Sequence, residues 1–181
     1  AAEDVMVARD ISLSELTGAN LHIPHVSTSG TVAMVREAKR RGLRVTAEVC
    51  PHHLTITDRW VIGGKGEDVG PPELAYDTST KVYPPLRGDN DVEALLEGLS
   101  DGTIDCIATD HAPHDFIGKM VTYQEAAFGI SVLETALGSI LSLVHRRVID
   151  LPTMVERLTV GPARVLGEKF ADYATMCPGT P

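Results

Sequence analysis

The sequence IDCIATDHAPH, from Ile104 to His114, contributes most to the prediction of the fold. Its first half, residues 104–108, has the apolar character of a short buried strand, and its second half places Asp110, His111 and His114 just beyond that strand. An aspartate followed by histidines one and four residues later is hard to explain by core packing. The stretch therefore predicts a buried strand that ends in a functional site.

Two earlier segments end in the same manner. Leu21 to Val26 is a strand-like run that ends at His25, and Arg44 to Cys50 is a second one that continues into His52 and His53. Apolar residues recur at helical spacing between and after these strands. The expected helices are Glu3–Thr17, one that is capped by Ser29 and ends at Gly42, one that starts at Asp89 or Asp91, Ser131–His145 and Leu151–Leu158.

Strands that alternate with helices indicate βα units and a parallel sheet. The α/β pattern therefore predicts that the strands containing Ile23, Val45 and Ile107 lie side by side. The carboxyl ends of the strands build the active site in a (β/α)8 barrel. Imidazole and carboxylate groups at such ends are suitable ligands for zinc, so we expect His25 and Asp110 to share one rim. Residues 63–79 are expected to form a loop.

The other histidines have plainer explanations. A lone histidine at a strand is more often a hydrogen-bonded structural residue, which is the expectation for His22. Adjacent residues such as His52 and His53 should point to opposite sides, so a structural or supporting role is at least as well founded as metal ligation. His145 lies late in a predicted helix and is expected at the surface, where a cation favours the helix C-terminus.

The composition narrows the class of protein. The chain has 181 residues, enough for one domain with a core, and a formal net charge of −9 with pI near 5.2. This excess of acidic over basic residues offers no basic surface for nucleic acid or an anionic membrane. The three cysteines are too few for a disulfide framework, and residues 1–4 have no signal-peptide character. We expect a cytoplasmic protein.

Several motifs together resemble the class I dihydroorotases, a family of the amidohydrolase superfamily. The resemblance extends from Ala8 to about Gly167. The motifs that carry it are HIPHVST (22–28), AEVCPHHL (47–54), KVYPPLR (81–87), ATDHAPH (108–114), FGI (128–130) and ETA (134–136).

The resemblance implies a fold and a set of site residues. The fold is the (β/α)8 TIM barrel, and this chain would be one partial domain, residues 1–181, holding about strands 6–8. His25 resembles the metal ligand on strand six, and Asp110 resembles the ligand and proton shuttle on strand eight. His114 resembles a substrate-contacting histidine, and Phe128 and Gly129 resemble the loop whose backbone meets the pyrimidine ring.

Two departures from the family pattern are visible. No His-x-His motif precedes His25, so the N-terminal half-barrel and the sandwich strands are expected to be missing, and the fragment alone is expected to be inactive. Half of a barrel has open strand edges, so self-association or a complementing N-terminal half is expected. The second departure is Tyr83, which occupies a substrate-binding position where the family usually has asparagine.

The reaction that the resemblance implies is the reversible, zinc-dependent hydrolysis of dihydroorotate to N-carbamoyl-aspartate in pyrimidine biosynthesis, with two zinc ions in the intact enzyme. Asp110 would take the proton of a metal-activated water and return one to the leaving nitrogen. Two alternatives stay open. Tyr83 favours another cyclic amidohydrolase, of the allantoinase or hydantoinase type. The chain could also be a noncatalytic assembly partner, for example of aspartate transcarbamoylase.

Overall fold

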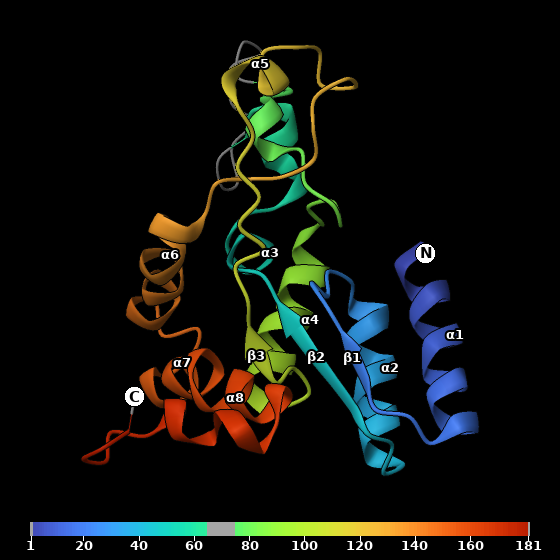
Figure 1. The fold of residues 1–181 in the computed structure, drawn as a ribbon. Coiled ribbons are helices and arrows are strands. Elements are labelled where there is room, and N and C mark those ends of the chain that lie inside the picture. The colour runs from blue at the N-terminus through green and yellow to red at the C-terminus, as the bar shows by residue number, and fades with distance from the viewer. Residues whose placement is uncertain (1, 65–74, 181) are drawn as a thin grey trace.

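A parallel sheet of three strands organises the computed structural model, which describes residues 2–64 and 75–180. The strands are β1 (Leu21–Ile23), β2 (Val45–Val49) and β3 (Cys106–Ile107), in the order β1-β2-β3. Leu21 pairs with Val45 and Glu48 pairs with Cys106, both in parallel register. The predicted parallel arrangement is confirmed, and all three strands point their carboxyl ends toward the side where α3 lies (Figure 1).

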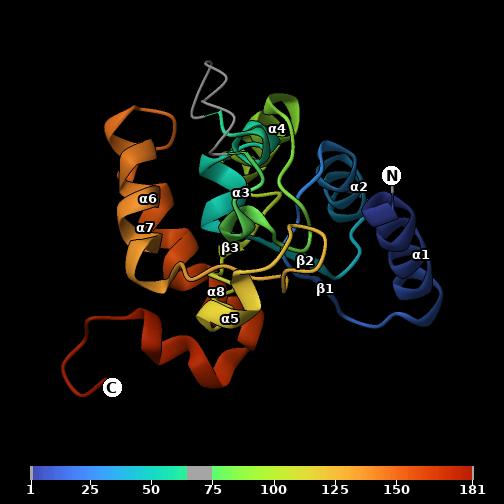
Figure 2. The same ribbon diagram turned by 90° about the horizontal axis from the view of Figure 1, so that it is seen from above.

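Helices α1 and α2 lie toward the β1 edge of this sheet, and α6 to α8 lie toward its β3 edge (Figures 1 and 2). The α-helices of the described residues are α1 (Ala2–Thr17), α2 (Ser29–Arg40), α3 (Pro51–Thr55), α4 (Asp89–Asp101), α5 (Phe116–Lys119), α6 (Leu133–His145), α7 (Leu151–Leu158) and α8 (Val160–Leu166). Shorter 3₁₀ turns are η1 (Asp58–Ile62), η3 (Thr78–Thr80) and η4 (Glu168–Ala174). None of the described helices has the length and apolar character needed to cross a membrane.

The strands are shorter than the sequence pattern predicts, although the hydrogen bonding continues beyond them. The amide of Val26 donates to the Glu48 carbonyl at 2.8 Å, and the amide of Ala108 donates to the Val49 carbonyl at 3.1 Å. The chain therefore stays beside the sheet up to the residues that precede the candidate site. Residues 63–79 were predicted to be a loop, and of these residues 65–74 lie outside the described part of the chain.

The expected cap of α2 is wrong by one residue. Ser29 is the first residue of the helix, and the N-cap is Thr28, whose hydroxyl accepts a hydrogen bond from the Thr31 amide. A hydroxyl at this position satisfies one of the free amides of the first turn. Glycine ends α1 as predicted, because Gly18 adopts a left-handed φ of 68° that other residues adopt at a cost.

The hydrophobic core lies between the sheet and the helices. Val32 and Val35 of α2 and Leu95 and Leu99 of α4 are almost fully buried, and α2 packs against both α1 and α4. At the amino end of β3 the Asp105 carboxylate accepts hydrogen bonds from the Ala47 amide (2.8 Å) and the Lys39 ammonium (2.7 Å). These contacts fix β3 beside β2, and the strand ends are thereby held at one rigid edge.

Candidate active site

The two predicted metal ligands follow the outer strands of the sheet. His25 comes two residues after β1 and Asp110 three residues after β3, at the same edge because the strands are parallel. Both have left-handed backbone conformations, with φ of 39° for His25 and 48° for Asp110. Such conformations are uncommon for residues other than glycine, and they concentrate at functional sites. No described residue hydrogen-bonds the His25 ring or the Asp110 carboxylate.

Glu48 of β2 holds the backbone turn that carries His25. Its carboxylate accepts a hydrogen bond from the His22 ring at 3.1 Å, and its backbone carbonyl accepts one from the amide of Val26, the residue after His25. The bond from His22 is the main cause of a lowered pKa at Glu48, and it outweighs the burial that would raise this pKa. His22 also contacts the Thr46 hydroxyl at 2.8 Å. His22 is therefore a structural residue in this chain, in agreement with the expectation.

A cavity of about 420 Å³ opens beside His25. Its wall comes from the first half of α1, from the end of β1 and from the segment 83–87. Tyr83 and Arg87 line the same cavity as His25. The cavity therefore connects the predicted metal ligand with the residue at which this sequence departs from the family pattern.

The end of β2 forms a buried cluster. Cys50, His52 and His53 place their ligand atoms within 4.8 Å of one another, and the two imidazole rings lie 4.4 Å apart. The expectation that His52 and His53 point to opposite sides is wrong, because residues 51–55 form the short helix α3 instead of continuing the strand. Burial, together with the nearby His53 and His25, lowers the pKa of His52 to about 3, so its ring is neutral.

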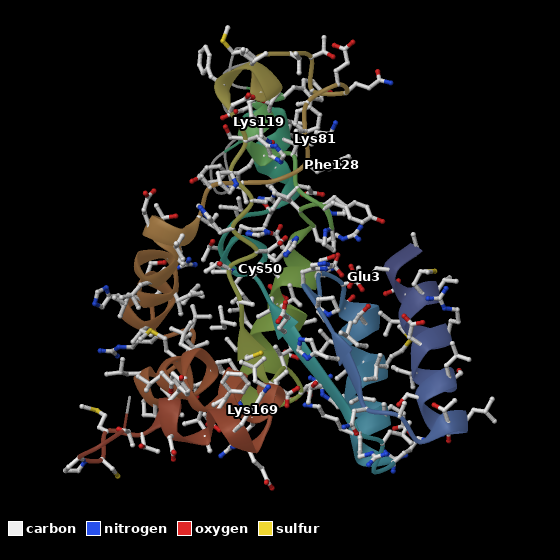
Figure 3. All side chains as sticks on the ribbon, in the orientation of Figure 1. Glu3, Cys50, Lys81, Lys119, Phe128 and Lys169 are labelled. Atoms are coloured by element: carbon white, nitrogen blue, oxygen red, sulfur yellow. The ribbon has the colours of Figure 1, made fainter. Side chains whose placement is uncertain are left out.

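The charges of the predicted ligands His25 and Asp110 affect the pKa values of this cluster. Burial raises the pKa of the Cys50 thiol, and the charges of Asp110 and Glu48 raise it further. His25 contributes to the lowered pKa of both His52 and His53. Cys50 lies between the sheet and the loops above it (Figure 3). The titratable residues that follow the three strands are thus close enough for their charges to shift one another's pKa values.

The four predicted substrate-binding residues are in contact with one another. The Tyr83 and Phe128 rings meet edge to face with centroids 5.8 Å apart, and both side chains are more than half exposed. The His114 ring donates through Nε2 to the Phe128 carbonyl at 2.7 Å. Gly129 has φ of 141°, and a Cβ there would lie 2.5 Å from the Ala112 carbonyl oxygen. Only glycine fits this close approach.

Two lysines, which the sequence gave no reason to single out, hold this aromatic cluster in place (Figure 3). The Lys119 ammonium donates to the carbonyls of Thr78, Ala127 and Gly129 at 2.7–2.9 Å. The Lys81 ammonium donates to the Gln124 carbonyl and lies 4.5 Å from the centre of the Phe128 ring. The loop that contains Phe128 and Gly129 is therefore held by two lysine ammonium groups, of which Lys81 is buried and Lys119 is partly buried.

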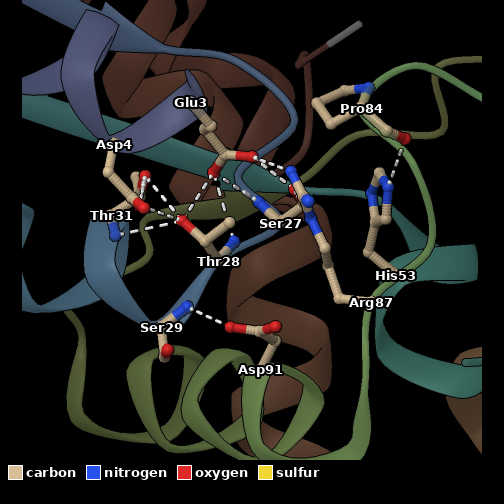
Figure 4. Close-up of polar contacts among 10 residues, drawn as sticks. All are labelled: Glu3, Asp4, Ser27, Thr28, Ser29, Thr31, His53, Pro84, Arg87 and Asp91. Atoms are coloured by element: carbon tan, nitrogen blue, oxygen red, sulfur yellow. Dashed lines mark hydrogen bonds and ion pairs between the residues drawn. The ribbon is translucent and has the colours of Figure 1, made fainter. Parts of the chain in front are cut away.

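A second network that was not predicted joins α1 to the loop after β1 (Figure 4). The Glu3 carboxylate accepts hydrogen bonds from the amides and hydroxyls of Ser27 and Thr28, and it pairs with Arg87 at 3.4 Å. Burial would raise the pKa of Glu3, but these hydrogen bonds outweigh it and lower the pKa. Arg87 also donates to the Ser27 hydroxyl. The network ties α1 to the segments that follow His25 and Tyr83.

His111 has a structural function. Its Nδ1 atom accepts hydrogen bonds from the amides of Val132 and Leu133, both at 3.1 Å, at the start of α6. Helix starts leave amides without partners, and this ring satisfies two of them. His145 is exposed in the last turn of α6, as expected.

The sequence is similar to curated dihydroorotases. It is 56% identical to the dihydroorotase of Pelotomaculum thermopropionicum over 167 residues and 55% identical to that of Anaeromyxobacter sp. (strain K) over 166 residues, in each case 92% of this chain. This chain is homologous to a segment of the dihydroorotases. It spans 36% of the length of these two relatives. No family model matches the chain.

Solved structures of related enzymes have the same fold as this dihydroorotase-like segment. The L-hydantoinase (dihydropyrimidinase) of Arthrobacter aurescens superimposes on 98% of the chain with a TM-score of 0.83 at 26% identity, and the chain covers 37% of that protein. The α/β arrangement of this chain therefore matches one part of that longer protein. The resemblance inferred from the sequence motifs is confirmed by these two kinds of similarity.

Proposed function

We propose that this dihydroorotase-like segment supplies the last strands of a (β/α)8 amidohydrolase barrel, with β1, β2 and β3 as strands six, seven and eight. The whole protein would hydrolyse a cyclic amide, and we propose dihydroorotate as its substrate. The observation that carries this proposal is the pair His25 and Asp110. Both have left-handed backbones and unengaged side chains at one edge of the sheet, beside an aromatic cluster.

The donor set fits zinc in part. An imidazole and a carboxylate are common zinc ligands, but a catalytic zinc ion normally has three protein ligands. Among the described residues, neither His25 nor Asp110 belongs to a group of three potential ligands. We propose that these two residues would hold zinc together with ligands from the part of the relatives that this chain does not span, and that the intact protein holds two ions. The 181-residue chain alone would then be inactive.

The residues of this chain have distinct tasks in the proposed reaction. When bound, zinc polarises a carbonyl and makes a water molecule more acidic. The Asp110 carboxylate accepts the proton of the attacking water and returns it to the ring nitrogen as the amide bond breaks. Tyr83 and Phe128 offer aromatic surface to the ring of the substrate, and His114 and Lys119 fix the loop that carries Phe128. Glu48 fixes the backbone beside His25, because its carbonyl accepts a hydrogen bond from the Val26 amide.

A hydantoin or dihydropyrimidine is the alternative substrate. The observation in its favour is Tyr83, whose side chain is 70% exposed and lines the cavity beside His25. A phenol ring cannot make the paired donor and acceptor contacts of an asparagine amide, so it recognises a ring mainly by its apolar face. The solved structures named as hydantoinases make this alternative worth a direct comparison.

The outer sides of β1 and β3 carry no strand partner in the described residues. Unpaired parallel strands tend to recruit a partner, so we propose that this chain associates with the complementary half of a barrel or, without it, with a second copy. Sedimentation of the purified chain, alone and with the complementary part of the P. thermopropionicum relative, measures this directly. A monodisperse monomer under both conditions contradicts the proposal.

The test of activity is a chimera. This chain replaces the matched 167 residues of the P. thermopropionicum dihydroorotase, and turnover of dihydroorotate, hydantoin and dihydrouracil is measured with zinc present. We expect turnover of dihydroorotate by the chimera and none by the 181-residue chain alone. If a folded chimera acts only on hydantoin or dihydrouracil, the alternative substrate class is correct. If it acts on none of the three, the proposed function is wrong.

A further inference from the structure

The buried cluster after β2 has an unusual combination of properties. Cys50, His52 and His53 are 0%, 4% and 2% exposed, and they lie within four residues of one another in the sequence. Within residues 2–64 and 75–180, both ring nitrogens of His52 and the Nδ1 atom of His53 have no hydrogen-bond partner. We propose that Cys50, His52 and His53 bind one zinc-class cation at a site separate from the pair His25 and Asp110.

The missing hydrogen bonds are the first argument. A buried polar atom without a partner costs about 1–3 kcal/mol, and each such atom in a native protein needs an explanation. Three of them occur in two adjacent side chains of this chain. A cation bound by one nitrogen of each ring would satisfy two of the three atoms. The free energy of metal binding would then offset the cost of burying them.

The hydrogen bonding of His53 is the second argument. Its Nε2 atom lies 3.0 Å from the Pro84 carbonyl oxygen, which can only accept, so this nitrogen carries the proton (Figure 4). The neutral ring then has its lone pair on Nδ1, the atom that lacks a partner. A histidine that donates one N–H to a backbone carbonyl while its other nitrogen binds a metal is the common arrangement in metal sites. His53 therefore has the tautomer of a ligand.

The geometry needs a small closure. The ligand atoms lie within 4.8 Å of one another, whereas a tetrahedral zinc ion with bonds of about 2.0–2.3 Å needs separations of about 3.3–3.6 Å. Binding would therefore require the side chains of His52 and Cys50 to rotate so that their ligand atoms come about 1 Å closer. Cys50 precedes the first turn of α3, and both histidines lie in that turn, so one short rigid element carries all three groups.

The ligand types decide which cation fits. One sulfur and two imidazoles favour a borderline or soft ion such as Zn²⁺ or Co²⁺, while Mg²⁺ and Ca²⁺ prefer oxygen. Binding exchanges the thiol proton of Cys50 for the cation, and this proton leaves to the solvent. The sulfur ligand also distinguishes this site from the pair His25 and Asp110, which offers only nitrogen and oxygen ligands.

Cobalt reports sulfur ligation by its own spectrum. The purified 181-residue chain, stripped with a chelator, is titrated with Co²⁺ and then with Zn²⁺. We expect one equivalent of Co²⁺ to produce a sulfur-to-cobalt charge-transfer absorption that Zn²⁺ removes. We expect Cys50→Ser to abolish this absorption. The matched control is Cys106→Ser, a buried cysteine of β3 outside the cluster, which keeps it. His53→Gln should weaken binding at least ~10–100-fold.

Two further measurements keep the result decisive. The double variant His25→Asn/Asp110→Asn must retain the absorption, because the proposed site does not use these residues; its loss would mean that the cation belongs to the site of the proposed function. X-ray absorption of the zinc-loaded native chain must show one sulfur and two nitrogen ligands, which does not depend on any variant. A native chain that binds no Co²⁺, or binds it without sulfur, overturns the inference and leaves the proposed function untouched.

Discussion

The segments after β2 and after β3 end at the same edge of the sheet but differ in their polar chemistry. After β2, Cys50, His52 and His53 are buried, and three of the histidine ring nitrogens have no partner among the residues that the structure describes. After β3, His111 and His114 are exposed, and each makes hydrogen bonds to the backbone of a neighbouring segment. Histidine content alone therefore says little about function. Burial together with the presence or absence of partners separates a histidine that shapes a loop from one that is available to a ligand.

The largest effect should come from Asp110, the unengaged carboxylate of the β3 segment. In the dihydroorotase chimera, Asp110→Asn keeps the size of the side chain but cannot accept a proton. We expect kcat to fall by ~10²–10⁴, the usual contribution of general acid–base catalysis. The control is Glu97→Gln on an exposed part of α4, which should retain full activity. If Asp110→Asn and Glu97→Gln change kcat of the chimera equally, Asp110 is not the group that transfers the proton.

The β2 segment should make the stability of the chain sensitive to pH. His52 has a folded pKa of about 3 against 6.5 when unfolded, so the unfolded state binds more protons between these values. Stability is then complete above pH 6.5 and falls with decreasing pH, by about 1.4 kcal/mol per pH unit for one such group. Lowered carboxyl pKa values, such as that of Glu3, act in the same direction only below about pH 4.5.

The window from pH 6.5 to 4.5 therefore isolates the buried histidines, of which His53 also has a lowered pKa. We expect His52→Leu to reduce the slope in this window and, because it removes two unpartnered nitrogens, to stabilise the chain by about 1–3 kcal/mol at pH 7. Urea denaturation with a chelator present measures both effects. The exposed His145→Gln on α6 is the control. An unchanged slope in His52→Leu would show that this ring is not buried in its neutral form.

The contrast between the two segments also shows how far sequence reasoning reaches. The order and direction of the strands could be predicted, because apolar runs such as Val45–Val49 alternate with helical patterns. The cluster of His52 and His53 could not, since five residues carry too little periodicity to reveal α3, which packs against α4 and α6. The roles of Glu3 and Lys119 depend on contacts between residues 24 to 84 and 8 to 41 positions apart. Such pairs exist only after folding.

Glycine substitutions test whether the loop beyond β3 is as tightly built as the cluster beyond β2. Gly129→Ala would force a Cβ within 2.5 Å of the Ala112 carbonyl and 2.9 Å of the His114 ring. We expect a loss of about 1–3 kcal/mol of stability, the usual cost of overpacking, and a raised KM in the chimera. Gly138→Ala on α6 meets no atom within 4 Å and should stabilise the helix by about 0.5–1 kcal/mol. Urea denaturation of both variants checks the opposite signs.

The smallest effect should come from His111, which is the satisfied counterpart of His52. Its Nδ1 atom caps α6 by accepting from two amides, and its ring is exposed, so the solvent can replace part of what is lost. We expect His111→Ala to cost about 1 kcal/mol, similar to the loss of a helix cap. His111→Asn retains an acceptor at a similar position and should recover most of that loss. If His111→Ala instead stabilised the chain, as expected for His52→Leu, the distinction between partnered and unpartnered histidines at this edge would be wrong.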